Sequence, residues 1–202
     1  EMTYVLATGR TWFLVGPTVR FWLEGELPPG VYARDVIHYI AGEYGDFVGR
    51  NIEFVGPGAH GLSIPARQTI ATMSAEISAE FALFEADEKL LQYLEGRAKR
   101  PFEPVTSDPD ANFEAVYRVD LSKLEPQVVL PGRVAHNVRP AYELEKERIK
   151  VTQAFIGSCA NGRLEDLKVA AELLRGRRVH PDVRLIVTPG SMAVWKGACR
   201  EG

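Results

Sequence analysis

The sequence is poor in cysteine, in unbalanced charge and in long apolar runs. It contains two cysteines in 202 residues, which excludes a disulfide-rich scaffold and predicts free thiols. The 24 basic and 27 acidic residues leave a formal net charge of -3, so charge gives no reason to expect a nucleic acid or an anionic membrane as partner. No apolar run approaches the ~20 residues that a membrane-spanning helix requires. We therefore expect a cytoplasmic protein that binds neither nucleic acid nor membrane.

The composition is typical of a globular protein, with 46% hydrophobic and 25% charged residues, and it argues against extended disorder. We find no internal repeat and no low-complexity tract. The chain begins at Glu1 without an initiator methionine and stops at Gly202 without a polar tail. Both ends predict that the chain is part of a longer protein.

Residues 18–97 alternate between strand-like and helix-like patterns. The expected strands are 19–23, 51–55 and 81–84, and the last of these should be buried because it is short and apolar. The expected helices cover 33–44, a segment opened by Pro65 that reaches Ala79, and a segment capped by Asp87 and ending at Gly96. The repeated strand–helix order predicts an α/β unit built of layers.

The rest of the chain divides into three pieces. Residues 1–17 are expected to be the tail of a preceding unit, and 98–127 a proline-punctuated linker that contains a strand near 116–121. Residues 128–202 are expected to start a second α/β unit. Its elements are strands at 153–156 and 184–187 and helices at 164–174 and from 192 onward.

The segment around Cys159 carries the strongest chemical signal. An apolar strand runs into Gly157-Ser158-Cys159, and an amphipathic helix follows. Open α/β sheets bind ligands at the carboxyl ends of their strands, and a nearby helix N-terminus favours the thiolate form of cysteine. Three interpretations remain open from the residues alone. Cys159 is a buried core thiol, a nucleophile, or one ligand of a metal cluster completed elsewhere. A nucleophile would need a base, and no motif places His136 or His180 for that role.

The segment 157–163, followed by Glu165-Asp166-Leu167, resembles the first cluster-ligand motif of the aconitase superfamily. Its Asn-Gly-Arg form is similar to the large subunits of 3-isopropylmalate dehydratase and homoaconitase. Further similar segments occur in the family's order at 6–13, 17–19, 27–31, 35–37, 52–54, 56–58, 107–111 and 188–191. The resemblance covers nearly the whole chain and places it in the middle of a longer family member.

This resemblance implies three-layer α/β/α units, one complete and one partial. It also implies a hydro-lyase of leucine or related biosynthesis that isomerises a 2-hydroxy di- or tricarboxylic acid by dehydration and rehydration. The substrate would be of the 3-isopropylmalate or homocitrate type. Three cysteines would hold a [4Fe-4S] cluster, and a small swivelling subunit would be the partner.

The resemblance also assigns roles to individual residues. Cys159 matches the first metal ligand, and Asn161 matches a residue that supports cluster or substrate, although it could instead cap the following helix. The run 69–76 resembles the family's Thr-Ile-Cys-Asn-Met-x-x-Glu segment. Glu76 matches its catalytic carboxylate, with a surface glutamate on an amphipathic helix as the alternative. Thr72 stands at the position of a substrate-binding asparagine.

Three departures bear on the substrate: Ala71 and Thr72 replace Cys-Asn, and Ala160 replaces the usual Thr. One thiolate cannot hold a [4Fe-4S] cluster, so these 202 residues alone are expected to bind no cluster and to be inactive. Two alternatives remain open. One is another hydratase of the superfamily, of the aconitate, methylcitrate or dimethylmalate type, and the other is a non-catalytic α/β module without a cluster.

Overall fold

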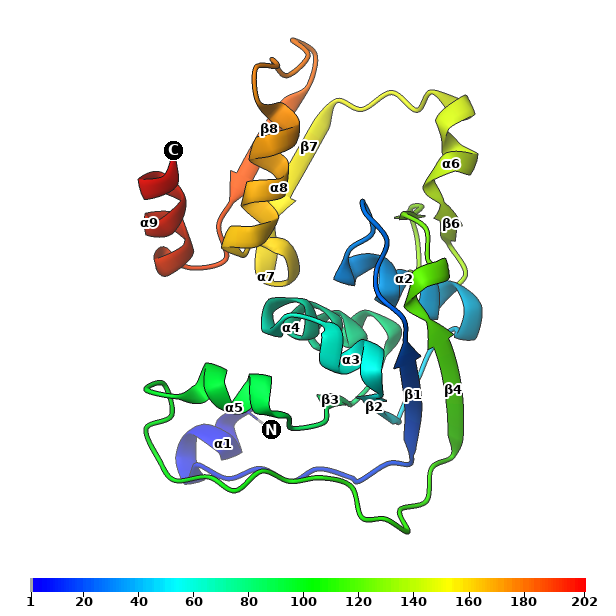
Figure 1. Cartoon of the computed structure of the whole chain (residues 1–202), viewed down its shortest axis with the longest axis vertical. Helices are drawn as coiled ribbons and strands as arrows, with labels where there is room; N and C mark the ends of the chain where they lie inside the picture. Colours follow the sequence, from blue (N-terminus) through cyan, green and yellow to red (C-terminus); the bar gives the residue numbers. More distant parts are fainter. Residues whose placement is uncertain (1) are drawn as a thin grey trace.

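A computed structural model describes residues 2–202, and its centre is a four-stranded parallel sheet (Figure 1). The strands are β1 (Thr18–Glu24), β2 (Asn51–Val55), β3 (Phe81–Phe84) and β4 (Ala115–Asp120), in the spatial order β3-β2-β1-β4. Successive strands extend the sheet to one side of β1, and β4 then joins its other side. The α/β class is thus confirmed, and the chain changes direction in the sheet between β1 and β4, where such sheets form a crevice.

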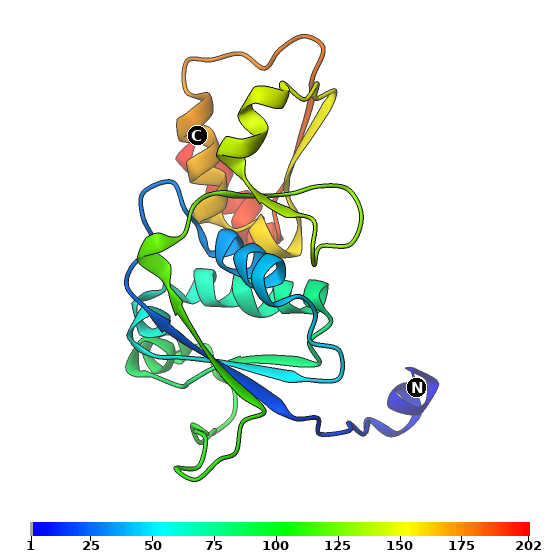
Figure 2. The same ribbon diagram turned by 90° about the vertical axis from the view of Figure 1, so that its right-hand side faces the viewer.

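One face of this sheet carries the hydrophobic core. Buried and half-buried residues alternate along β1, so Val19, Phe21 and Leu23 point to the same face. The helices α2 (Ala33–Tyr44) and α4 (Ile64–Met73) lie on that face, as Figure 2 shows. At the middle of the core, the centres of the Phe21 and Phe54 rings lie 5.8 Å apart. The predicted strands and the helix at 33–44 are confirmed because their apolar periodicity matches this packing.

The helix opened by Pro65 ends earlier than predicted. Ser63 caps α4 by accepting a hydrogen bond from the backbone N–H of Ala66 at 3.2 Å. The chain then tightens into the 3₁₀ helix η1 (Ser74–Ile77), and Ser78 takes a left-handed conformation with φ of +62°. A non-glycine residue in that conformation ends a helix, so the expected extension to Ala79 is wrong.

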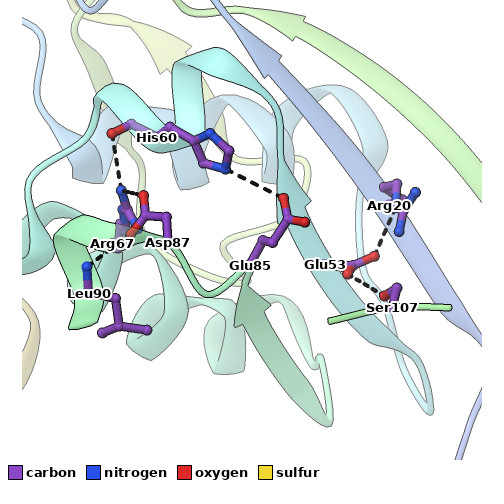
Figure 3. A network of polar contacts seen from close by, with 8 residues as sticks. All are labelled: Arg20, Glu53, His60, Arg67, Glu85, Asp87, Leu90 and Ser107. Carbon is purple, nitrogen blue, oxygen red and sulfur yellow. Dashed lines mark hydrogen bonds and ion pairs between the residues drawn. The ribbon is translucent and has the colours of Figure 1, made fainter. Parts of the chain in front are cut away.

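A buried ion pair joins α4 to the helix α5 (Glu88–Leu94), as Figure 3 shows. The Arg67 guanidinium is 4% exposed and donates two hydrogen bonds to the Asp87 carboxylate, at 2.9 and 2.6 Å. Asp87 also accepts from the backbone N–H of Leu90 at 2.9 Å, which confirms it as the cap of α5. One carboxylate therefore neutralises a buried charge and starts a helix.

On the opposite face of the sheet, polar side chains contact the loop that precedes β4. Arg20 Nε donates to Glu53 Oε2 at 2.8 Å, and Ser107 Oγ donates to Glu53 Oε1 at 2.6 Å (Figure 3). The Arg20 guanidinium also lies 3.7 Å from the centre of the Phe113 ring. These contacts fix the long loop against the sheet.

Two expectations about the sheet need correction. β3 is an edge strand and is only half buried: Ala82 and Phe84 pack against the core, whereas Phe81 and Leu83 are exposed on the opposite face of the sheet. β4 lies within the segment 98–127 that the sequence suggests as a linker. Its pairing with β1, from Val19 opposite Ala115 onward, makes it part of the first sheet.

The strands and helices expected between 153 and 200 are all present. β7 (Gln153–Gly157) and β8 (Arg184–Thr188) pair in parallel, next to α8 (Leu164–Leu174) and α9 (Met192–Glu201). The remaining elements are α1 (Met2–Thr8), α3 (Pro57–Gly61), η2 (Leu121–Lys123), β5 (Gln127–Val129), β6 (Val138–Pro140), α6 (Ala141–Leu144), η3 (Glu145–Glu147) and α7 (Ser158–Asn161). Within residues 2–202, every helix is too short or too polar to cross a membrane.

Candidate functional site

Three of the four residues that the sequence singles out line a single pocket of about 660 Å³: Glu76, Cys159 and Asn161. Glu76 comes from η1, and the other two come from α7, which packs against α4 (Figure 1). The start of α2 provides a third wall, with Tyr32 and Arg34. The fold thus brings together residues that lie far apart in the sequence.

Cys159 is held by an unusual turn at the end of β7. Gly157 has a φ of +136°, and a Cβ atom at this position would lie 2.0 Å from the carbonyl oxygen of Thr188, so only glycine fits. Ser158 follows with a φ of +80°, a rare conformation for a non-glycine residue that is often found at functional sites. The turn leaves Cys159 exposed. The interpretation of Cys159 as a buried core thiol is therefore wrong.

The nucleophile interpretation lacks the histidine base that it would need at this pocket. No histidine belongs to its lining within the described part of the chain. The Cys159 Sγ atom has a polar neighbour in Ser158 Oγ at 3.6 Å. A hydroxyl group does not take up a proton as an imidazole does, so the geometry favours Cys159 as a ligand over Cys159 as an activated nucleophile.

Asn161 is held on both sides of its amide. Arg34 Nη1 donates to Asn161 Oδ1 at 3.3 Å, and Asn161 Nδ2 donates to Asp166 Oδ1 at 3.1 Å. The capping residue of α8 is Arg163, whose backbone N–H donates to Asp166 Oδ2 at 2.9 Å. The alternative that Asn161 caps this helix is therefore wrong, and its amide is left beside the pocket.

Glu76 and Thr72 take different positions. Glu76 is exposed at the pocket and forms no side-chain hydrogen bond or ion pair with the described residues. Thr72 is exposed on α4, one turn earlier, and does not belong to the lining that residues 2–202 provide. The two would share one face of a continuous α-helix. Because the chain changes to a 3₁₀ helix at Ser74, Thr72 and Glu76 do not share one helix face.

The charged groups of the pocket are mostly satisfied within the protein. Asp35 accepts hydrogen bonds from the backbone N–H groups of Tyr32 and Gln127, both at 2.8 Å. Asp166 accepts hydrogen bonds from the Asn161 amide and from the backbone N–H of Arg163. The lining then offers the guanidinium of Arg34 and the carboxylate of Glu76 to a ligand. Sequence reasoning missed Arg34, although its place in the first turn of α2, after a Pro-Pro-Gly turn, could have pointed to it.

The same arginine influences a neighbouring buried histidine. His38 lies on the buried face of α2, and its pKa is lowered to about 4, first by burial and then by the positive charge of Arg34. His38 is therefore neutral near pH 7. His38 is thus a structural residue of the core, because a charge at this buried position would be unfavourable.

A second cavity of about 540 Å³ adjoins the pocket and shares Tyr32, Asn161 and Asp166 with it. Gly25 and Leu121 also line this cavity, at the ends of β1 and β4. It thus occupies the crevice where the direction of the sheet changes, the usual ligand position in open α/β sheets.

The possible metal-binding side chains of the pocket can be compared with the ligands that an iron–sulfur cluster needs. Cluster irons bind cysteine thiolates, and Cys159 offers an exposed thiol at an open pocket. Residues 2–202 contain no group of three His, Cys, Asp or Glu side chains arranged to bind a metal. The described residues therefore fit one corner of a cluster and do not provide a complete set of ligands.

Comparisons with known proteins identify the family of this chain. The model of the aconitase family (aconitate hydratase) matches residues 1–202. The chain is 48% identical to the 3-isopropylmalate dehydratase large subunit of Mycolicibacterium smegmatis, over 100% of this chain and 47% of that protein. It is 44% identical to the 3-isopropylmalate dehydratase large subunit of Halothermothrix orenii, over 100% of this chain and 48% of that protein. It is 41% identical to a probable methanogen homoaconitase large subunit of Methanothermobacter thermautotrophicus, over 100% of this chain and 47% of that protein. The chain thus spans about half the length of these relatives, and it belongs to the aconitase family.

Proposed function

We propose that this chain is part of an iron–sulfur hydro-lyase that isomerises a 2-hydroxy di- or tricarboxylic acid by dehydration and rehydration. One observation carries the proposal: Glu76, Cys159 and Asn161 line one pocket, and Arg34 adds a cation to it. Membership of the aconitase family and similarity to dehydratase large subunits support the same reaction class.

In this proposal Cys159 is one of the ligands of a [4Fe-4S] cluster, and the other ligands lie outside the described residues. When bound, the cluster supplies a Lewis acid that polarises the bond between carbon and the hydroxyl group. Glu76 would exchange a proton with the hydroxyl oxygen that leaves and returns, while a base from outside the described residues would take up and give back the proton of the neighbouring carbon. The Glu76 carboxylate is suited to its role because no described residue forms an ion pair with it.

Arg34 and Asn161 would orient the substrate. A guanidinium forms two parallel hydrogen bonds with a carboxylate, so Arg34 fits one carboxylate of a hydroxy acid. The amide of Asn161 keeps one N–H group beyond the one donated to Asp166, and it can donate to substrate or cluster. For Thr72, which lies outside the pocket lining that the described residues provide, substrate binding stays a prediction that rests on the resemblance of the run 69–76.

The relatives' names suggest the substrate and the partner. Dehydratase large subunits point to 3-isopropylmalate and to leucine biosynthesis, and a probable homoaconitase points to homocitrate. The term "large subunit" implies a small subunit, which we propose as the partner of the complete protein. A reducing cytoplasm would suit the free thiols. The 202 residues alone would be inactive, because they contribute one thiol to the site.

The metal part of the proposal is tested on the longer protein that contains this chain, purified without oxygen. We expect stoichiometric iron and charge-transfer absorption, and loss of both with Cys159→Ser. Cys199→Ser is the matched control, because Cys199 is also exposed but lies on α9, outside the pocket lining. An iron-free parent protein, or full turnover in the Cys159→Ser variant, would overturn the proposal.

The substrate part is tested with Glu76→Gln and a panel of 2-hydroxy acids of the 3-isopropylmalate, homocitrate, citrate, methylcitrate and dimethylmalate types. Loss of a proton-transferring group should lower kcat by about 10²–10⁴-fold with an unchanged iron content. Glu80→Gln, at an exposed position outside the pocket, is the control. The preferred acid identifies the substrate class, and a parent protein that holds no cluster and acts on none of these acids would favour the non-catalytic alternative.

A further inference from the structure

We propose that Thr69 and Arg163 position the turn that carries Cys159 and Asn161 against α4, and thereby fix it relative to Glu76. We call the group formed by Gln68, Thr69, Ala160 and Arg163 the inter-unit clamp. The inference deepens the proposed function, on which its catalytic consequence rests, and its geometry can be tested independently of that function.

The clamp centres on the carbonyl oxygen of Ala160, which lies between the two pocket residues of α7. Thr69 Oγ1 donates to this oxygen at 2.9 Å, and the Arg163 guanidinium donates to it as well. Arg163 Nη1 also donates to Thr69 Oγ1 at 2.9 Å. The hydroxyl therefore accepts one hydrogen bond and donates another, and the three groups form a closed triangle.

A fourth contact extends the triangle along α4. Arg163 Nε donates to Gln68 Oε1 at 3.1 Å, so the guanidinium contacts two successive residues of that helix. Thr69 is only 2% exposed, and Ala160 is buried too. Water has little access to replace these hydrogen bonds, so removing one partner leaves a buried polar group unsatisfied.

The other side of the turn is also fixed. The backbone N–H of Gly190 donates to the carbonyl oxygen of Gly162 at 2.7 Å. A Cβ atom on Gly162 would lie 2.5 Å from the carbonyl oxygen of Ser158, so the backbone is packed closely here. The turn is thus held by β8 and its following loop on one side and by α4 on the other. The clamp is the side-chain connection to α4, and the hydrogen bond from Arg34 to Asn161 is the connection to α2.

This arrangement gives the clamp a role at the pocket. α4 leads directly into η1, which carries Glu76, so a fixed contact between Thr69 and Ala160 sets where the Cys159 turn lies relative to that carboxylate. Displacements of about 1 Å from productive geometry can cost about 100-fold in rate. Thr69 and Arg163 act through other residues, so they are positioning residues rather than catalytic ones.

The geometric test uses hydrogen–deuterium exchange on the longer protein that contains this chain. Thr69→Val keeps the shape and removes the hydroxyl, whereas Thr69→Ser keeps the hydroxyl. We expect about tenfold faster exchange in residues 158–163 for Thr69→Val and for Arg163→Gln. Exchange should stay near the unsubstituted rate for Thr69→Ser and for Arg175→Gln, an exposed arginine at the end of α8.

The outcomes separate positioning from a general loss of stability. Unchanged exchange of residues 158–163 in both Thr69→Val and Arg163→Gln would overturn the clamp. Equal acceleration throughout the chain, with a matching fall in Tm, would also overturn it, because the residues would then be merely structural. The Arg163→Gln variant keeps the test decisive if Thr69→Val does not fold.

The catalytic consequence is tested in the longer protein with its cluster. We expect Thr69→Val to lower kcat at least tenfold, to leave KM within about twofold and to alter the electron paramagnetic resonance spectrum of the reduced cluster. Thr69→Ser should restore all three. Wild-type kcat and spectrum in Thr69→Val would contradict the positioning role. An iron-free unsubstituted protein would instead refute the proposed function, and the exchange measurement would still decide the clamp.

Discussion

The first sheet and the β7–β8 region follow the same α/β pattern but differ in how much they bury. Seven residues of α2 are buried, whereas α8 and α9 have none. Apolar side chains of the β7–β8 region, such as Trp195, instead surround an open groove of about 870 Å³. Two strands and two helices do not cover each other's apolar faces, but four strands with α2 and α4 do. We infer that the first sheet provides most of the stability of these 202 residues.

Replacing one strand phenylalanine in each region gives the largest expected difference. Phe21 is 0% exposed in the first sheet, and Phe155 is 54% exposed on β7. Phe21→Ala should lower the free energy of unfolding by about 3–5 kcal/mol, because it removes apolar contacts and leaves a cavity. Phe155→Ala should cost less than about 1 kcal/mol. Denaturant unfolding measures both, and equal losses would contradict the comparison.

The pH dependence of stability should also originate in the first sheet's helices. The pKa of His38 is about 4 in the folded protein, against an ordinary value of 6.5. Below pH 6.5 the unfolded chain binds a proton that the folded protein refuses, so stability falls as the pH drops from about 6.5 to about 4. The loss should reach about 3 kcal/mol, since each pKa unit corresponds to about 1.4 kcal/mol.

A matched pair of variants identifies the histidine responsible. His38→Gln should remove most of this pH dependence from urea unfolding between pH 4 and 7. His180→Gln, at an exposed position before β8, should leave it unchanged. A slope that persists in His38→Gln would show that other groups cause it.

Ion pairs offer a third comparison. Arg67 and Asp87 are almost buried, whereas Lys168 and Glu201 join α8 to α9 at 2.7 Å in an exposed pair. Asp87→Asn should cost about 2 kcal/mol, because it weakens two charge-assisted hydrogen bonds while asparagine can still cap α5. Glu201→Gln should cost about 0.5 kcal/mol or less. Similar losses in thermal unfolding would be the contrary result.

The Asp87 effect should depend on pH. Hydrogen bonding to Arg67 is the main cause that lowers the pKa of Asp87. A carboxyl group with a lowered folded-state pKa stabilises the protein above its unfolded-state pKa and loses that effect as the pH falls through the folded value. The difference between the original protein and Asp87→Asn should therefore shrink in strong acid, which unfolding at pH 2 and pH 7 would check.

Helix caps give the smallest and most local test. Ser63 caps α4 and Ser191 caps α9, and each side chain accepts one backbone hydrogen bond at 3.2 Å. Ser63→Ala should lower the global stability by about 1 kcal/mol. Ser191→Ala should instead accelerate hydrogen exchange in α9 alone, because this helix buries no residue of its own. A global effect of Ser191→Ala would show that α9 unfolds together with the first sheet.

Much of the fold could be predicted because local patterns and tertiary packing agree. The helix at 33–44 and the strand at 51–55 were placed correctly from apolar spacing and β-branched residues. The exposure of Phe81 and Leu83 on β3 was not predictable from its apolar composition, since burial depends on whether the tertiary structure covers that face of the sheet. The early end of α4 depends on the left-handed conformation of Ser78, which no residue pattern signalled.

The residues of the candidate site were also predictable only in part. Cys159, Asn161 and Glu76 could be named from a resemblance in short segments, and the fold brings them to one pocket. Arg34, Thr69 and Arg163 were missed because their roles arise from contacts between residues far apart in the chain. A single sequence gives no indication of which distant residues form hydrogen bonds with one another. The exposure of Cys159 likewise depends on the backbone of the turn rather than on its neighbours in sequence.

The central position of β1 has a consequence for synthesis on the ribosome. β1, β2 and β3 emerge one after another and can pair as soon as they leave the exit tunnel, but one side of β1 pairs with β4, whose first residue is Ala115. Until then that side of β1 offers free backbone groups to any other nascent chain. The interval between the appearance of Phe84 and Asp120 is therefore the window in which chaperone protection would matter most.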